Sequence, residues 1–443
     1  MERSELAVPI GKVGLATAIA IVVANMVGTG VFGSLGFQVA GIPTGFPIML
    51  LWTIGGVVSF CGAVCYAELA AMFPKSGGEY HLLTKTWNPF VGFLSGWLSV
   101  TVGFAAPVAA NATLLGTYLG NIFETRPIVF SLPVVLLVSL VHLGKMKNIG
   151  RFQSWFTYSK VALIVVLGLL GFLIGTAQPI SFLPREGDAE LIGSSSFAIS
   201  LVYVLYAYTG WNAATYMMDE VKNPTRTVPL AILIGTAIVT VLYVFINAAF
   251  LYATPVEDMA GEAEVGLIAA RAILGPGGGM VMGILISFGL ISTISSMTWA
   301  GPRVTAAIGR DHRSFGVLSR TNRNGVPALA VLLQTVIVLA LVLSATFEQL
   351  LNYVQALLTI SSLLVVIGMV YFRFRHPDIS RPYRAWGFPV TPLIFAAVSL
   401  YVLWFQLNEK TAEFLYGLGT LALGVVVYAF ARRGERSRNA ADS

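Results

Sequence analysis

Two short glycine-containing runs interrupt apolar segments of this chain and free main-chain groups that could bind a ligand. The first run is Gly28-Thr29-Gly30 and the second is Thr209-Gly210-Trp211-Asn212. In a lipid bilayer, a helix can unwind only where its freed N–H and C=O groups find partners in a protein-lined cavity. Two such breaks at matching places therefore indicate a binding site near the middle of a membrane protein.

The polarity of the two breaks favours a ligand with one anionic and one cationic end. A half-helix that begins near Thr29 and Gly30 directs free N–H groups and its positive dipole end into the cavity. A half-helix that ends between Tyr206 and Thr209 presents unpaired carbonyls, which suit a cation or an ammonium group. Together these groups match the two charges of an α-amino acid. The alternative is that the glycines serve only close helix packing. This explanation is less convincing for two matching breaks than for one.

The residues around the breaks limit the charge that the ligand can carry. Neither break contains Asp or Glu, and the nearest polar side chains, Asn25 and Asn212, are neutral. A cationic side chain buried without a counter-ion would be costly, so we expect a neutral amino acid. Small substrates such as alanine and large ones such as leucine both remain open.

Lys160 is the second candidate for a functional role. It lies in an apolar segment, at least two helical turns beyond the basic loop that ends at Arg151. An ammonium at this depth is costly and typically faces a cavity, where it binds carbonyls or hydroxyls. The alternative is that its long side chain reaches the inner membrane interface.

The elements that must position these residues are predicted to be membrane-spanning helices. The chain is 56% hydrophobic and 11% charged, against roughly 45–50% and 25% for soluble domains. Apolar stretches of about 20 residues, the length that crosses a ~30 Å hydrocarbon core, recur along it. The twelve expected spans are 13–40, 46–71, 88–120, 128–144, 152–175, 195–220, 227–252, 278–300, 326–344, 350–372, 388–406 and 412–431.

The distribution of charge predicts the orientation of these spans. Most of the 27 Lys and Arg fall on one side when every span crosses once, which the positive-inside rule assigns to the cytoplasm. We therefore predict a multi-pass protein of the plasma (inner) membrane with both termini cytoplasmic. We attribute the net charge of +6 to orientation and contact with membrane lipid, and not to binding of nucleic acid.

The order of the spans predicts an internal repeat. Five spans in 13–175 open with the first break, and five in 195–372 open with the second. Because five is odd, the second block enters the membrane from the opposite side, which is the inverted-repeat plan of many secondary transporters. Helices 11 and 12, within 385–431, stand outside the repeat, and 1–12 and 432–443 form the cytoplasmic ends.

The residues at the breaks resemble a known family. Gly28-Thr29-Gly30-Val31-Phe32 resembles the first-helix motif of the amino acid–polyamine–organocation superfamily. Tyr208-Thr209-Gly210-Trp211-Asn212 is similar to the sixth helix of its L-type amino-acid transporters, and Ala67-Glu68-Leu69 and Lys75-Ser76-Gly77-Gly78-Glu79-Tyr80 fit the same subgroup. The resemblance implies an all-α fold like that of the bacterial leucine transporter, with helices 1 and 6 unwound. It also implies Na⁺-independent amino-acid transport, often as exchange.

The resemblance assigns roles to matching positions. The N–H groups of Thr29 and Gly30 and the Thr29 hydroxyl would take the substrate carboxylate. The main-chain carbonyls of Met26, Tyr206 and Thr209 would take the ammonium. The full expected binding set is Met26, Gly28, Thr29, Gly30, Tyr206, Thr209, Gly210 and Asn212.

Three further roles follow from the same resemblance. Tyr206 would gate the site, and Asn212 would help hold the unwound segment. Lys160 would place an ammonium where sodium-coupled relatives hold Na⁺ between helices 1 and 8. There it would contact first-helix carbonyls and the hydroxyl of Ser295 or Ser296.

Other classes of function receive little support from the sequence. The four histidines lie at loops or span ends without metal-ligand spacing, and no Gly-Lys-Ser/Thr phosphate loop is present. We therefore expect no metal, no cofactor and no enzyme activity. The rival within transport is proton-coupled symport, with Lys160 or Glu68 exchanging the proton. A nutrient receptor or channel on the same scaffold is a more distant alternative.

Partner subunits can be judged from the cysteines. Cys61 and Cys65 are the two cysteines of the chain and lie one helical turn apart, too far along a helix to bridge each other. Eukaryotic L-type light chains bond a heavy chain through a cysteine between spans 3 and 4, and the corresponding loop 121–127 has none. We expect no disulfide-linked heavy chain, and a monomer or weak homodimer.

Acidic residues at the predicted inner helix ends suggest a gate latch. Glu68, Asp219 and Glu220 lie near Lys75, Lys222 and Arg226 in sequence. The commoner explanation is exposed helix-end ion pairs, which contribute little.

Overall fold

The described part of the chain is helical and rich in segments of membrane-spanning length. The structure is a computed structural model that describes residues 13–144 and 149–441; the expected N-terminal segment 1–12 lies outside them. Nine helical segments within these ranges are long and apolar enough to cross a membrane: Leu15–Gly33, Gly45–Met72, Pro89–Phe123, Trp155–Ile174, Pro224–Ala253, Val265–Asp311, Phe347–Arg375, Val390–Glu409 and Thr411–Arg432. The all-α prediction is confirmed at this level.

The other three expected spans also correspond to apolar helices. The shorter α8 (Ile128–Leu143) and α15 (Ala328–Ser344) lie at the fourth and ninth positions. The sixth position holds an interrupted pair of helices, described below.

The first break is where the sequence predicts it. Helix α1 (Leu15–Met26) ends before Val27, and α2 (Thr29–Gly33) begins after Gly28. A short helix, α3 (Leu35–Val39), follows directly. The first membrane segment is therefore divided into shorter helices that leave main-chain groups free at residues 27–28.

The second break differs in detail from the expectation. Helix α11 (Ser195–Ala207) ends in a turn at Tyr208–Gly210, and the chain continues as a 3₁₀ helix, η2 (Trp211–Glu220). Gly210 has φ of +104°, a conformation that suits glycine because it lacks a Cβ. The tighter 3₁₀ helix, with about three residues per turn, places Asn212 and Tyr216 differently from the resumed α-helix that an apolar segment suggests.

The first half of the chain supplies the walls around the first break. These are α4 (Gly45–Met72), α5 (Gly78–Thr86), α6 (Pro89–Leu98), η1 (Ser99–Gly103), α7 (Ala105–Phe123) and α9 (Ile149–Ile174). Between α6 and α7, the third span contains a π-helical turn, η1. Such turns add a residue to the helix and occur often at functional sites.

The second half supplies the opposing walls. Its elements are α10 (Asp188–Ile192), α12 (Pro224–Ala253), α13 (Val256–Met259), α14 (Val265–Asp311), η3 (Arg313–Ser319), α16 (Phe347–Arg375), α17 (Val390–Glu409) and α18 (Thr411–Ala441). Gly275, with φ of +74°, is not helical and divides α14 into two helical parts, of which the second contains the expected span 278–300 and continues to Asp311.

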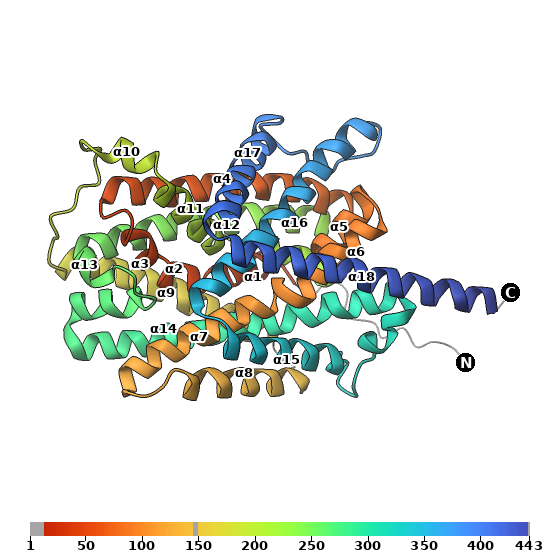
Figure 1. The fold of residues 1–443 in the computed structure, drawn as a ribbon, viewed down its shortest axis with the longest axis horizontal. Helices are drawn as coiled ribbons and strands as arrows, with labels where there is room; N and C mark the ends of the chain where they lie inside the picture. The colour runs from red at the N-terminus through yellow and green to blue at the C-terminus, as the bar shows by residue number, and fades with distance from the viewer. Residues whose placement is uncertain (1–12, 145–148, 442–443) are drawn as a thin grey trace.

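The long helices run in one general direction around the two breaks. In Figure 1, α10 and α13 lie at one end of the molecule, and α5 and the C-terminal part of α18 lie at the other. Helix α1 packs against α9, α12, α14 and η2, and α12 packs against α4. The first break is thus enclosed by elements from both halves of the chain.

The predicted latch around Glu68 has different partners. The Glu68 carboxylate is buried and pairs with Arg373, at 2.5 Å, and with Arg381, at 3.3 Å. It also accepts a hydrogen bond from the Ala385 N–H at 2.6 Å. This cluster ties α4 to α16 and the following loop, over 300 residues away in sequence. The expectation of an exposed helix-end pair was therefore wrong for Glu68.

Glu220, by contrast, forms a partly exposed pair with Arg303 at 3.3 Å. Asp219 accepts a hydrogen bond from the Ser76 N–H at 3.4 Å. Both contacts lie at the surface, as expected for helix-end groups.

Candidate substrate-binding site

The two breaks face each other in the structure. Gly30 lies directly against Ala207, so closely that a Cβ added to Gly30 would overlap the Ala207 backbone. The hydroxyls of Thr29 and Tyr206 lie 3.3 Å apart and connect the breaks through side chains. A Cβ on Gly210 would lie 3.0 Å from the Asn25 carbonyl. The glycines therefore permit close approach between the two interrupted segments.

Tyr243 of α12 holds free carbonyls from both breaks. Its hydroxyl lies 2.6 Å from the Met26 carbonyl oxygen and 3.0 Å from that of Ala207. Both carbonyls come at helix ends, where no further turn of the helix supplies a donor. The Tyr206 carbonyl is satisfied locally, by the Thr209 hydroxyl at 2.7 Å.

We expect Tyr243→Phe to loosen the breaks. The substitution leaves two buried carbonyls without this donor, at a cost of about 1–3 kcal/mol. The thermal midpoint of the purified protein should therefore fall. Tyr401→Phe, at an exposed position of α17, is the control for the same chemical change. A variant with the wild-type midpoint would contradict this role of Tyr243.

Lys160 bridges the first break to α14. Its Nζ donates to the carbonyls of Ala24, at 3.1 Å, and Val27, at 2.8 Å. It also donates to the Thr293 hydroxyl at 2.9 Å. The side chain is 3% exposed, so the ammonium is buried among oxygens and does not extend to the protein surface.

The hydroxyl partner of Lys160 differs from the prediction of Ser295 or Ser296. Ser295 instead bonds the His142 ring at 2.9 Å, and Ser296 accepts from the Asn25 amide at 3.0 Å. Ser295, two residues from Thr293, lies on a different face of α14, whereas Ser296 lies almost one turn from Thr293 on a neighbouring part of the same face and bonds Asn25 instead.

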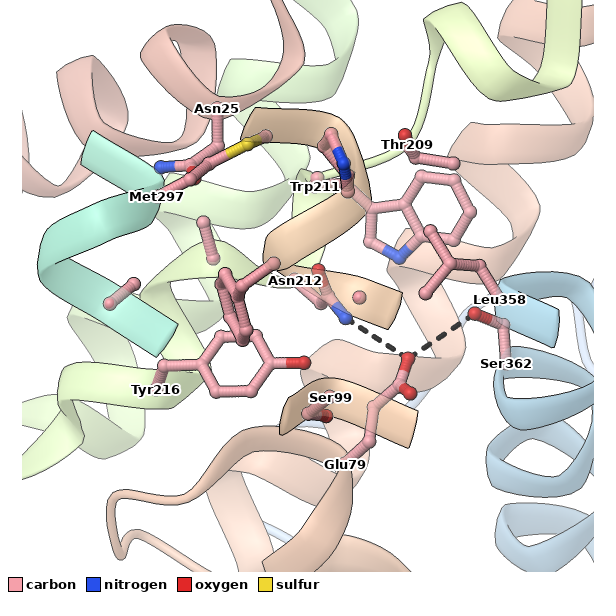
Figure 2. Close-up of a pocket in the computed structure, with 16 residues that line it drawn as sticks. Asn25, Glu79, Ser99, Thr209, Trp211, Asn212, Tyr216, Met297, Leu358 and Ser362 are labelled. Atoms are coloured by element: carbon pink, nitrogen blue, oxygen red, sulfur yellow. Dashed lines mark hydrogen bonds between the residues drawn. The ribbon is translucent and has the colours of Figure 1, made fainter. Parts of the chain in front are cut away.

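A cavity adjoins the breaks (Figure 2). It has about 60 Å³ for the centre of a water molecule. Its lining residues are Asn25, Glu79, Ser99, Gly103, Phe104, Pro107, Thr209, Gly210, Trp211, Asn212, Ala213, Tyr216, Met297, Ala300, Leu358 and Ser362. The lining thus combines residues of η1, α14 and α16 with the second break.

The predicted binding residues fall into two groups in this structure. Thr209, Gly210 and Asn212 line the cavity. Met26, Gly28, Thr29, Gly30 and Tyr206 are buried beside it at the contact between the two breaks.

Glu79 is the residue of the cavity that sequence reasoning missed. Its carboxyl accepts hydrogen bonds from the Asn212 amide at 3.0 Å and the Ser362 hydroxyl at 3.3 Å (Figure 2). The expectation of neutral side chains around the site was therefore incomplete, since Asn212 holds its segment by contacting an acid. The available signal was the family motif around Gly77 and Gly78, which places an acid directly after two glycines.

Burial affects the titration of residues on α5. Desolvation raises the pKa of the Glu79 carboxyl, and its hydrogen-bond donors oppose that rise. Burial, with help from Lys75 and Lys85, lowers the pKa of His81 to about 4. His81 is therefore neutral at pH 7 and supplies no positive charge to the Glu79 region.

The opposite side of the breaks is closed by packed side chains. Phe37 lies beside Tyr203 and Phe347, with ring centroids 5.6 Å and 6.2 Å away. The Tyr203 hydroxyl donates to Glu348 at 2.7 Å, and Lys410 pairs with the same carboxylate at 2.8 Å. These contacts join α3, α11, α16 and Lys410, which directly follows α17, on this side of the breaks.

Comparison with known families decides the class of this protein. The family model described as amino acid permease matches residues 13–427. The chain belongs to the amino acid permease family. The resemblance seen at the breaks is therefore confirmed, and this permease is a secondary transporter and not an enzyme.

Individual relatives agree with this assignment. The permease is 29% identical over 434 residues to the mouse b(0,+)-type amino acid transporter 1, covering 94% of this chain and 87% of the relative. It is 26% identical over 434 residues to the mouse large neutral amino acids transporter small subunit 2, covering 94% and 80%. It is also 26% identical over 416 residues to mouse solute carrier family 7 member 12, covering 90% and 88%. Two of these relatives are named as amino-acid transporters, and the apolar helices of the permease are consistent with a multi-pass membrane protein.

Proposed function

We propose that this permease exchanges neutral L-amino acids across the plasma membrane by alternating access, without Na⁺. The observation that carries the proposal is the contact of the two breaks beside a cavity. Substrate carboxylate would bind at the Thr29 and Gly30 N–H groups and the Thr29 hydroxyl. Substrate ammonium would bind carbonyls of the breaks, taking the place of Tyr243 at Met26 and parting Tyr206 from Thr29.

Independence from Na⁺ is supported by the position of Lys160. Two carbonyls and one hydroxyl around its Nζ form the oxygen-rich surroundings that suit a small monovalent cation. A tethered ammonium occupies such a site permanently, so no ion has to accompany the substrate. We propose that Lys160 links α1 to α14 throughout the transport cycle. On α14 it bonds Thr293, and not the nearby Ser295 or Ser296.

The cavity favours a small substrate. At about 10–15 Å³ per water, 60 Å³ accommodates about four to six waters, comparable to the non-hydrogen atoms of alanine. The four hydrogen-bond donors of Glu79 are neutral and leave its carboxyl engaged. A small neutral amino acid therefore fits this state of the cavity.

The architecture that we propose around the site is the inverted repeat of the sequence prediction. It has twelve spans, with 13–175 and 195–372 as the two repeats, helices 11 and 12 in 385–431, and both termini in the cytoplasm. Burial of Cys61 and Cys65 supports a carrier without a disulfide-linked heavy chain, as a monomer or weak homodimer.

Reconstitution in liposomes tests exchange directly. Labelled alanine uptake should require unlabelled amino acid inside the vesicles and should be unchanged when Na⁺ is replaced by choline. Uptake into empty vesicles, driven only by acid outside, would instead support the proton symporter. Labelled leucine measured in the same way tests the preference for small substrates.

A further inference from the structure

A buried acid joins three parts of the fold beside the cavity. Glu79 is 3% exposed and lies at the start of α5. Its carboxyl accepts from Tyr66 on α4 at 2.5 Å, from Asn212 on η2 at 3.0 Å, and from serines on α16. Among the ion pairs of the described residues, none includes Glu79. A buried carboxylate without a cationic partner is costly, and protonation removes that cost.

The types of these partners allow two protonation states. Oε1 receives the Tyr66 hydroxyl, the Asn212 amide and the Ser362 hydroxyl. An amide N–H can only donate, so Oε1 must remain an acceptor. Among the hydrogen bonds of the described residues, Oε2 has only the Ser361 hydroxyl as a partner. A hydroxyl can either donate or accept, so Oε2 is the oxygen that can carry a proton.

The Ser361 hydroxyl next to Oε2 has a second partner, which allows it to accept or donate in either protonation state of Glu79. Ser361 Oγ lies 3.0 Å from Ser95 Oγ on α6. With Glu79 ionised, Ser361 donates to Oε2 and can accept from Ser95. With Glu79 protonated, Oε2–H donates to Ser361, which can donate in turn to Ser95. Both states are therefore satisfied by rotation of hydroxyls, without movement of the backbone.

We propose that Glu79 is a proton-binding site that controls the rate of amino-acid exchange. On protonation, the Glu79 carboxylate takes one proton from a hydronium ion in the cavity onto Oε2 and leaves a water molecule; on deprotonation, the carboxylic acid returns the proton to water as hydronium. Ionised Glu79 makes charge-assisted hydrogen bonds that hold α4, η2 and α16 together; protonation weakens them. Helix α4 belongs to the first half of the chain, and η2 and α16 belong to the second. Because protonation weakens the hydrogen bonds between them, these elements separate faster in the protonated state.

In the described part of the chain, the other titratable groups around Glu79 differ from it in type or in partners. The titratable groups that face it are the phenols of Tyr66 and Tyr216. Charged residues farther along the packed elements have other partners: Glu68 and Arg373 pair together, Glu220 pairs with Arg303, and Asp219 bonds Ser76. Helix α6 and η1 carry no charged residue. On α5 itself, His81 is neutral at pH 7 and Lys85 is exposed.

Exchange at equal pH on both sides of the vesicle membrane tests the proposal, because no proton gradient then drives transport. The proposal rests on amino-acid exchange through this cavity. Wild-type exchange of labelled alanine should rise about fivefold as the pH is lowered from about 8.5 to about 5.5. Glu79→Gln mimics the protonated acid, and its exchange should be independent of pH, at the wild-type low-pH rate. Glu190→Gln, at an exposed position of α10, is the matched control and should keep the wild-type profile.

Tyr66→Phe supplies a second test that does not depend on the folding of the Glu79 variant. Loss of a hydrogen bond to the ionised carboxylate raises its pKa, so the midpoint of the pH profile should move to higher pH. A rate change that is equal at every pH, with the midpoint unchanged, would overturn the proposal.

The outcomes separate this inference from the proposed function. Wild-type exchange that does not vary with pH, or a Glu79→Gln protein that keeps the wild-type profile, overturns the proton site and leaves exchange established. Absence of wild-type exchange at every pH overturns the proposed function, and the inference with it.

Discussion

Replacing Lys160 with alanine is expected to abolish amino-acid exchange while the protein still folds. The ammonium makes three hydrogen bonds, to two carbonyls of the first break region and to Thr293. A hydrogen bond to a charged group contributes about 1.5–3 kcal/mol. Loss of all three should change the balance between conformations by several kcal/mol, and so lower exchange by roughly 100-fold or more.

Folding should suffer less than transport in this variant. Removing Lys160 also removes the cost of keeping an ammonium away from water, and this offsets part of the lost hydrogen bonding. The protein should still elute as a single species in detergent. Lys85→Ala, which removes an exposed lysine of α5, should exchange at the wild-type rate. Wild-type exchange in the Lys160→Ala protein would exclude the proposed role.

Gly30→Ala is expected to have the second large effect, through steric overlap at the contact between breaks. The new Cβ would overlap the Ala207 Cα and Cβ and lie 3.2 Å from the Ala207 nitrogen. These are mainly backbone atoms, so no rotamer change can relieve the overlap and α2 must move away from α11. Overpacking of this kind costs about 1–3 kcal/mol or more, and it displaces the N–H groups proposed to bind the carboxylate.

Two measurements report on this substitution. Labelled alanine exchange should fall to background, and the thermal midpoint of the purified protein should decrease. Gly419→Ala is the matched control, since a Cβ at that position of α18 has no described atom within 4 Å. If Gly30→Ala exchanges alanine normally, the close contact between the breaks is not part of the transport cycle.

The central features of this site could be predicted because each has a local sequence signal. The breaks are glycine-containing polar runs inside apolar segments, and the structure interrupts the helices at residues 27–28 and 208–210. Lys160 is a single charge in an apolar segment, and burial of its ammonium among carbonyls follows from the cost of the alternatives.

Other features could not be predicted because they depend on contacts between distant residues. Glu79 lies on a short helix between spans, and its partners on α16 are 282 and 283 residues away. Arg373 and Arg381 reach Glu68 in the same way, over 305 residues or more. The 3₁₀ form of η2 is set by packing and not by an apolar period, and the hydroxyl beside Lys160 depends on the rotation of α14.

The burial of both cysteines has a practical consequence for studying this transporter. Cys61 is 6% exposed and Cys65 is inaccessible to solvent, so neither thiol is open to a polar reagent in the folded state. A cysteine introduced at Thr209 or Ala300, on the cavity wall, would then be the reactive position. Its rate of alkylation by a membrane-impermeant maleimide, added first to one side of the vesicles and then to the other, would report directly which face of the membrane the cavity opens to.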